Sequence, residues 1–223
     1  MNFGLSFSYI FQEEDWFQKI LLPGLCMLIP VIGWLVALGW ALKVTRNVIS
    51  GEEHPLPDLN FGQDLLHGFF AFLISFVYSL PVSILSSVSG WIGNWGFNGN
   101  EVIAIGTGLV TALIGLVAFA LGVVTTFFST AAIARYAATD DLGAAFQLEE
   151  VFALLKTNLG DWLLVAVGSV LAVGIIGPLG TVACIIGVVL TMTYGMAVAG
   201  HLLGQAYAQA QPMSNEPEII DAA

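Results

Sequence analysis

The fold of this chain is decided by residues 162–203, which read WLLVAVGSVLAVGIIGPLGTVACIIGVVLTMTYGMAVAGHLL. These 42 residues contain no Asp, Glu, Lys or Arg. As one helix they would be more than about 60 Å long, twice the thickness of a bilayer core. Gly177-Pro178-Leu179-Gly180 is a turn signal near the middle of the stretch. The stretch therefore predicts a tight hairpin of two membrane spans, 162–177 and 180–203.

Two further spans are predicted upstream of this hairpin, at 68–90 and 102–134. Each lies inside a run of more than 30 residues without a charged side chain. Over the whole chain 57% of residues are hydrophobic and 9% are charged, against about 25% charged in a soluble domain. This composition excludes a soluble globular protein and a disordered chain. We expect an all-α integral membrane helical bundle with four firm transmembrane helices.

The N-terminal apolar segment 20–42 has two interpretations. Its 23 residues are long enough to span a bilayer, but it contains Pro23, Gly24, Pro30, Gly33 and Gly39. It therefore either spans the membrane or re-enters from the cytoplasm by turning at Pro30 to Gly33.

The other segments complete a single membrane domain over residues 1–207. Residues 5–19 mix aromatic and acidic side chains, which predicts an amphipathic helix at the membrane interface with Trp16 as its anchor. The segment 90–101 reads as a turn between two spans. Residues 208–223 are polar and acidic and are expected to be a disordered tail.

The charges indicate partners and orientation. The formal net charge of −11 leaves no basic patch for phosphates, so the sequence predicts no nucleic-acid partner. Lys43, Arg46, Arg135 and Lys156 flank the spans on one face, which the positive-inside rule assigns to the cytoplasm. We therefore expect an integral protein of the cytoplasmic membrane, with its long polar loops and its C-terminus in the cytoplasm. The lipid bilayer is its first partner.

Small side chains recur every four residues on the last predicted helix. Such a face allows another helix to approach closely. It predicts packing within the bundle, with a homodimer interface as the alternative. The face consists of Ala183, Gly187, Thr191, Gly195 and Ala199.

No pattern of reactive side chains indicates catalysis or a cofactor. Hydrolase, phosphate-binding and paired-cysteine motifs are absent from the sequence, and Cys26 and Cys184 lie within apolar runs. Ionisable groups are missing from the centres of the predicted spans, which argues against the hypothesis that the protein is a proton-coupled pump. Three histidines, His54, His67 and His201, are the weak candidates for a metal site. We predict no catalytic residue, no cofactor and no bound metal.

Motifs in both halves of the chain resemble those of domain-of-unknown-function family 4013. The most specific are the Leu-Pro-Asp segment 56–58 and the ending 201–207, HLLGQAY. Trp40 and Leu59 depart from the family pattern, where Tyr and Trp are usual. The resemblance implies a prokaryotic multi-pass membrane protein without an established activity, so no catalytic residues carry over. The positions that carry it are Asp15, Trp16, Gly39, Arg46, Leu56, Pro57, Asp58, Gly68, Arg135, His201, Gly204, Gln205 and Tyr207.

Three functions remain open from the sequence. A non-enzymatic membrane scaffold or accessory subunit fits the small-residue faces and the lack of buried chemistry, and its partner would be another membrane protein or a second copy of this chain. A small-solute transporter or channel component fits the Pro-broken segments and a weak tandem repeat around Arg46 and Arg135. A membrane-embedded enzyme is the third alternative.

Overall fold

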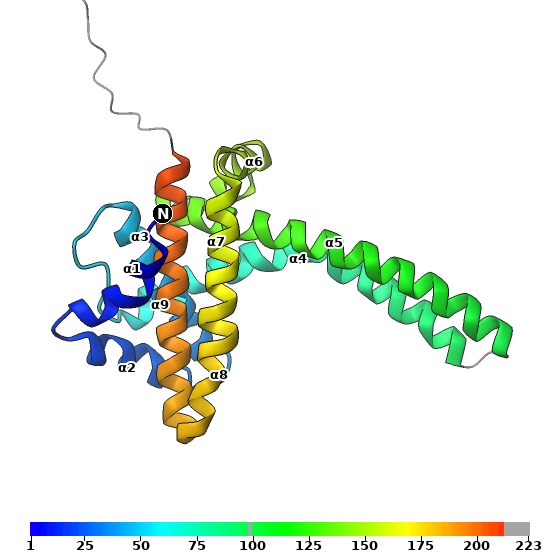
Figure 1. Ribbon diagram of the computed structural model, residues 1–223, viewed down its shortest axis with the longest axis horizontal. Coiled ribbons are helices and arrows are strands. Elements are labelled where there is room, and N and C mark those ends of the chain that lie inside the picture. Colours follow the sequence, from blue (N-terminus) through cyan, green and yellow to red (C-terminus); the bar gives the residue numbers. More distant parts are fainter. Residues whose placement is uncertain (98–99, 212–223) are drawn as a thin grey trace, which may run out of the picture.

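The computed structural model of the chain is a helical bundle with a long helical hairpin extending from it (Figure 1). It describes residues 1–97 and 100–211, which form helices joined by loops. The helices are α1 (Phe3–Ser8), η1 (Tyr9–Gln12), α2 (Trp16–Cys26), α3 (Ile32–Ile49), α4 (Phe61–Phe97), α5 (Glu101–Thr139), η2 (Ala144–Phe146), α6 (Leu148–Thr157), α7 (Leu159–Ser169), the π-helical η3 (Val170–Ile176), α8 (Gly177–Leu179), η4 (Gly180–Ala183) and α9 (Cys184–Ala210).

Four helical stretches in the described part of the chain are long and apolar enough to cross a membrane. They are Phe61–Gly96, Glu101–Thr139, Leu159–Val182 and Ile186–Ala210. The first three contain the predicted spans 68–90, 102–134 and 162–177, and the fourth begins six residues after the start of the predicted span 180–203 and covers the rest of it. The all-α membrane bundle with four such helices is therefore confirmed, and it indicates a membrane location.

The predicted hairpin of residues 162–203 is present, with its turn in α8 and η4 (Figure 1). The turn is tight: a Cβ on Gly180 would overlap the Gly187 carbonyl oxygen and the Thr191 hydroxyl, so the position requires glycine. Thr191 Oγ1 also donates a hydrogen bond of 2.6 Å to the Gly177 carbonyl oxygen. The glycines therefore allow the backbone of the turn to lie directly against α9. Helix α9 continues to Ala210, beyond the domain boundary predicted at 207, and the tail residues 212–223 lie outside the described part.

Helices α4 and α5 form a hairpin, here called the arm, which runs crosswise to α9 and away from the other helices (Figure 1). With 37 and 39 residues, these helices are about 55–60 Å long at 1.5 Å per residue. The turn predicted at 90–101 is much shorter than expected, since α4 continues to Phe97 and α5 begins at Glu101. Trp91 and Trp95 pack within this last part of α4, with ring centroids 4.7 Å apart.

The N-terminal region is broken at two places. The single helix predicted over 5–19 is interrupted between η1 and α2, where Glu13 is extended. The segment 20–42 is interrupted between Cys26 and Ile32, so it is not one continuous helix. Val31 has a φ of 65° at this second break, and the Gly33 amide donates to the Ile29 carbonyl oxygen. The break lies close to the turn that the re-entrant interpretation placed at Pro30 to Gly33, and whether the segment spans or re-enters the membrane stays a prediction.

Helix α3 lies between α4 and α9, and glycines permit both contacts. A Cβ on Gly39 would overlap the Asp64 carbonyl oxygen, and one on Gly68 would overlap the Leu35 carbonyl oxygen. On the other side, a Cβ on Gly200 would lie 2.5 Å from the Ala41 carbonyl oxygen. The three helices therefore touch backbone to backbone, the arrangement that small residues allow in membrane proteins.

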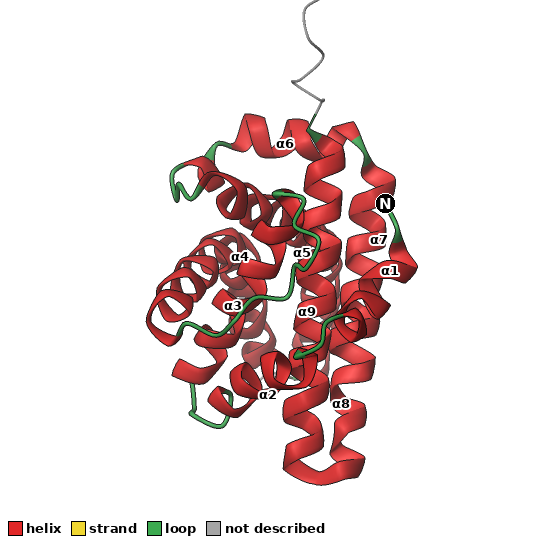
Figure 2. Cartoon of the chain, turned by 90° about the vertical axis from the view of Figure 1, so that its left-hand side faces the viewer, coloured by secondary structure: helices red, strands yellow, loops and turns green. Residues whose placement is uncertain are grey.

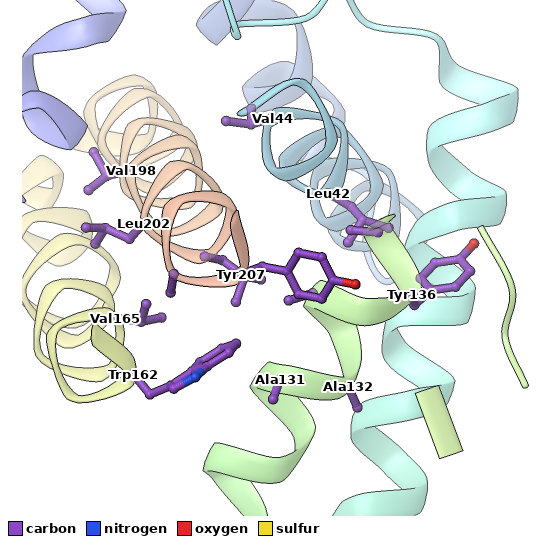
Figure 3. Packing of buried hydrophobic residues seen from close by; sticks show 14 of the residues in the cluster. Leu42, Val44, Ala131, Ala132, Tyr136, Trp162, Val165, Val198, Leu202 and Tyr207 are labelled. Atoms are coloured by element: carbon purple, nitrogen blue, oxygen red, sulfur yellow. The ribbon is translucent and has the colours of Figure 1, made fainter. Parts of the chain in front are cut away.

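The buried core lies where the base of the arm meets α3, α7 and α9. Figure 3 shows Trp162 of α7 and Tyr207 of α9 close to Ala131 and Ala132 of α5. Each of these four residues is at most 2% exposed. The small alanines make room for the two large rings, and this packing attaches the arm to the α7–α9 hairpin.

Candidate functional site

An extended segment bound along α3 is the first polar feature of the candidate site. Residues 55–58, here called the strap, belong to the loop between α3 and α4, which lies across the outside of α3 (Figure 2). Side chains bind all four strap carbonyl groups. Asn47 Nδ2 donates to Pro55 at 3.1 Å, Lys19 Nζ to Leu56 at 2.9 Å, Trp40 Nε1 to Pro57 at 2.9 Å and Lys43 Nζ to Asp58 at 2.7 Å.

The strap has the shape that its sequence favours. A residue before proline is pushed out of helical geometry, and both Pro55 and Pro57 lack an amide donor. The carbonyl groups of such a segment need donors from elsewhere in the structure. Trp40, Lys43 and Asn47 provide them because positions three and seven residues apart share one face of a helix.

Glu13 and Lys19 bind the strap from the N-terminal region. Glu13 Oε1 accepts a hydrogen bond of 2.9 Å from the Leu56 amide, and Glu13 Oε2 lies 2.5 Å from Lys19 Nζ. The Glu13 side chain is 4% exposed. These contacts explain the break before α2, since Glu13 turns inward to bind the strap and leaves the helix.

A buried ion pair joins α3 to the beginning of α4. Lys43 Nζ lies 2.8 Å from Asp64 Oδ1, and the Asp64 side chain is fully buried. Asp64 Oδ2 also accepts a hydrogen bond of 2.7 Å from the Asn60 amide, while Asn60 Oδ1 accepts one of 3.4 Å from the Gln63 amide. This reciprocal pattern is a variant of the capping box in which the returning carboxylate is four residues after the N-cap instead of three, so one carboxylate both caps α4 and pairs with α3.

Arg46 joins α3 to the end of α5. Its guanidinium forms an ion pair with Asp140 and lies 5.6 Å from the centre of the Tyr136 ring. His67 Nδ1 lies 2.9 Å from the Tyr136 hydroxyl and 3.4 Å from Arg46. The aromatic ring, the imidazole and the two charges therefore hold both arm helices against α3.

A second polar cluster fastens the N-terminus to α9. His201 Nδ1 lies 2.9 Å from Ser6 Oγ and 3.0 Å from Gln205 Nε2, and Tyr9 stacks on the imidazole with a centroid distance of 4.2 Å. Gln205 Oε1 accepts a hydrogen bond of 2.7 Å from the Asn2 amide. Burial, with Glu13 nearby, raises the pKa of Tyr9 well above its usual value. Its hydroxyl therefore stays protonated and donates to the Ala197 carbonyl oxygen at 3.1 Å.

The three histidines proposed as weak metal candidates are not brought together. His54 is exposed in the loop before the strap, His67 contacts Tyr136, and His201 contacts Ser6. Within residues 1–97 and 100–211, no group of three or more His, Cys, Asp or Glu side chains could hold a metal ion.

The remaining motif positions have separate places in the fold. Asp15 is exposed and precedes α2, and Trp16 packs edge to face with Phe11 at 5.0 Å. Arg135 Nη2 donates to Gln147 at 2.6 Å, with its other terminal nitrogen 3.2 Å from Glu150. Gly204 faces α3, where a Cβ would lie 2.8 Å from the Thr45 carbonyl oxygen.

The predicted small-residue face of α9 lies against the first half of its own hairpin and the turn that joins the two halves. Gly187 and Thr191 contact the turn around Gly180. A Cβ on Gly195 would lie 2.5 Å from the Ala172 carbonyl oxygen of η3. Ala199 borders a cavity, described next, and the side chain of Ala183 lies outside the described part of the chain.

A cavity of about 260 Å³ lies at the meeting point of α3, α4, α5, α7 and α9. Its wall is almost entirely apolar and includes Leu42, Ala71, Val165 and Met196. It is separate from the strap, whose carbonyl groups are bound by side chains of α2 and α3.

Several residues of these sites were not identified from the sequence. They are Glu13, Asn47, Asp64 and Ser6. Two signals were available for part of this set: the shared helix face of Trp40, Lys43 and Asn47 before a Pro-x-Pro segment, and the four-residue spacing of Asn60 and Asp64 at a helix start. Neither Glu13 nor Ser6 carries a local signal, because their partners are distant in the sequence.

Comparison with known proteins gives one match. The family model described as a protein of unknown function (DUF4013) matches residues 22–192. That range includes α3, the strap and the whole arm, whereas Asp15, Trp16 and the ending 201–207 lie outside it. No curated protein and no solved structure matches the chain.

Proposed function

The chain belongs to the DUF4013 family of proteins of unknown function, and from this premise we propose that it is a non-enzymatic accessory subunit that holds another membrane protein against its arm. The observation that carries the proposal is the exposed apolar surface of the arm. Large apolar side chains project from α5 along most of its length, including Ile105, Leu109, Leu113, Leu116 and Phe119, each at least 65% exposed.

The length of the arm favours a protein partner in addition to lipid. Its helices are about 55–60 Å long, whereas a bilayer core is about 30 Å thick. A hairpin of that length needs a strong tilt or cover from another molecule. The arm contacts the other helices at its base, so the remainder of its surface is available to a partner.

The surface of α5 also permits a close approach by a partner helix. Gly108, Gly115 and Gly122 recur every seven residues, which places them near one face of the helix. A Cβ added at any of these three would meet nothing within 4 Å. Open glycines of this kind let a second backbone pack closely in a membrane. They support a helix of another protein as the partner.

The strap, the contacts around Arg46 and the polar cluster around His201 support a structural role for the rest of the chain. Their charged and hydroxyl groups bind one another and the backbone. Ser6 and His201 are the arrangement nearest to a nucleophile and its base, but both are at most 5% exposed and the Tyr9 ring covers the imidazole. The geometry therefore supports a rigid platform for the arm more than it supports an enzyme.

Site-specific photocrosslinking in native membranes tests the proposal. A photoreactive residue at Leu113 on the arm should form a discrete adduct with a different membrane protein. The matched control is Val182, which is 89% exposed at the turn of the α7–α9 hairpin. Adducts with lipid alone at both positions, or an adduct only with a second copy of this chain, would contradict the accessory-subunit proposal.

A transporter component is the second candidate, supported by the break between α2 and α3. Discontinuous helices beside a cavity are common in transporters, and α3 contributes Trp34 and Leu38 to the cavity wall. Flux of apolar solutes into liposomes that rises when the protein is added would favour this candidate over the accessory subunit.

A further inference from the structure

The cavity among α3, α4, α5, α7 and α9 is an apolar hollow with a buried floor and a partly open side. Leu42, Ala71, Val165 and Met196 form part of its wall, and each is at most 5% exposed. Trp34, at the start of α3, is the one lining residue that is strongly exposed, at 41%. The cavity is therefore deepest beside these buried residues and opens to the surface at its less buried rim, which includes Trp34.

Three of the four hydroxyl side chains on the wall, those of Thr45, Ser75 and Thr130, are bonded within the protein, and the fourth belongs to Ser169. Thr45 Oγ1 donates to the Gly200 carbonyl oxygen at 3.0 Å, and Thr130 Oγ1 donates to the Thr126 carbonyl oxygen at 2.8 Å. Ser75 accepts a contact of 3.5 Å from the Ser129 hydroxyl. No lining residue is charged. A wall of this kind offers little to water or to a polar solute, and such cavities bind apolar molecules.

We infer that this cavity binds one hydrocarbon chain, either an acyl chain of a membrane phospholipid or a free fatty acid. Its walls come largely from the four membrane helices, so acyl chains are the abundant molecules at its mouth. Its volume of about 260 Å³ is near the lower limit for ligand sites. A helix of another protein, about 10–12 Å across with its side chains, is too wide to enter. This inference does not depend on the partner of the arm.

Native mass spectrometry of the full chain, purified in a mild detergent, measures the occupant directly. The wild-type protein should retain one acyl-bearing molecule per chain. A phospholipid mass and a fatty-acid mass distinguish the two sources, and either one supports the site. A wild-type chain that carries no such mass, while it stays folded, would overturn the inference.

Two cavity-filling variants locate the binding. Ala71→Phe and the smaller change Ala199→Leu each add apolar volume on the wall of the cavity. We expect either variant to lower the retained acyl mass by about tenfold or more. Ala120→Phe is the matched control because Ala120 is exposed on the arm. Equal retention in the control and in both filled variants would overturn the assignment to this cavity.

Thermal unfolding separates loss of binding from loss of folding. Hexadecanoic acid added to delipidated wild-type protein should raise its Tm, since a ligand that binds only the folded state stabilises it. The same addition should leave the Tm of a folded filled variant unchanged. An equal rise in wild type and filled variants would show that the fatty acid binds elsewhere, and would refute the proposed site.

Discussion

The contact between α3 and α4 gives the sharpest stability prediction, through the exchange Gly68→Ala. A Cβ at position 68 would overlap the Leu35 carbonyl oxygen and would lie 2.8 Å from the Gly39 amide nitrogen. Ordinary van der Waals contacts of a Cβ begin at 3.4 Å. Because its nearest neighbours are backbone atoms, the new methyl group cannot be accommodated by a change of rotamer. The two helices must move apart.

The magnitude follows from comparison with Gly62→Ala in the same helix. A Cβ at Gly62 would meet nothing within 4 Å, so that exchange should stabilise the protein by about 0.5–1 kcal/mol through helix propensity. Overpacking at Gly68 should cost about 1–3 kcal/mol. The two variants should therefore differ by about 1.5–4 kcal/mol in unfolding free energy. For a chain of this size the difference corresponds to about 3–16 °C in Tm.

Thermal unfolding of both variants in the same detergent, followed by tryptophan fluorescence, measures this difference. Gel filtration before heating checks that each variant is folded. If Gly68→Ala unfolds at the same temperature as Gly62→Ala or above it, the backbone contact between α3 and α4 is refuted.

Three further exchanges probe the buried polar contacts and the hairpin turn. Lys43→Met leaves the Asp64 carboxylate buried without its ion-pair partner and should cost about 3–5 kcal/mol of unfolding free energy. The double variant Lys43→Met with Asp64→Leu should recover much of this loss. A double variant that is no more stable than the single one in denaturant titration would contradict the pairing. Trp40→Phe removes the hydrogen bond to the Pro57 carbonyl oxygen, which should lower the unfolding free energy by about 1 kcal/mol and speed proteolysis of the strap. An unchanged rate of cleavage would contradict this prediction. Thr191→Val should lower the Tm because the Gly177 carbonyl oxygen loses its hydrogen bond from the Thr191 hydroxyl. Thr111→Val is the control and should have little effect on the Tm, because the Thr111 hydroxyl bonds to Gly108 of its own helix. Equal Tm values for the two variants would argue against the turn contact.

The spans could be predicted from the sequence because their signal is local. A charge-free run longer than a bilayer is thick defines a membrane helix without reference to the rest of the chain. The signal for the turn is local as well, because Gly177-Pro178-Leu179-Gly180 marks a turn by its own composition. The structure shows that only a small residue fits at Gly180, beside the Thr191 hydroxyl.

The breaks and the direction of the arm depend on contacts between distant residues. Glu13 interrupts the predicted helix over 5–19 because its partner is the Leu56 amide, far along the chain. Helix α4 extends beyond Gly90, partly because Gly96 packs against Thr107 of α5. The crossing of the arm over α3 is fixed by Gly39 and Gly68, and glycine spacing alone does not state which helices will meet.

The candidate site was predicted only in part. The resemblance identified Leu56, Pro57 and Asp58, and the structure adds the reason for their extended shape, which is that side chains bind all four strap carbonyl groups. Of the charges that bind the strap, Lys43 had been assigned only to the membrane orientation. Sequence analysis could not give their pairing, because Lys43 meets Asp58 and Asp64 only after the chain turns back along α3.

The central claim is that the arm extends away from the α7–α9 hairpin and offers a free apolar surface. Cysteine crosslinking in native membranes, with Cys26 and Cys184 replaced, tests this geometry most directly. Gly93→Cys with Thr111→Cys is the positive control, since a Cβ on Gly93 lies 3.6 Å from the Thr111 methyl group. We predict that this pair forms a disulfide, while Ile105→Cys with Leu179→Cys stays unlinked even with a short bifunctional thiol reagent. Efficient linkage of Ile105→Cys to Leu179→Cys would place the arm upright beside the hairpin and would contradict the account.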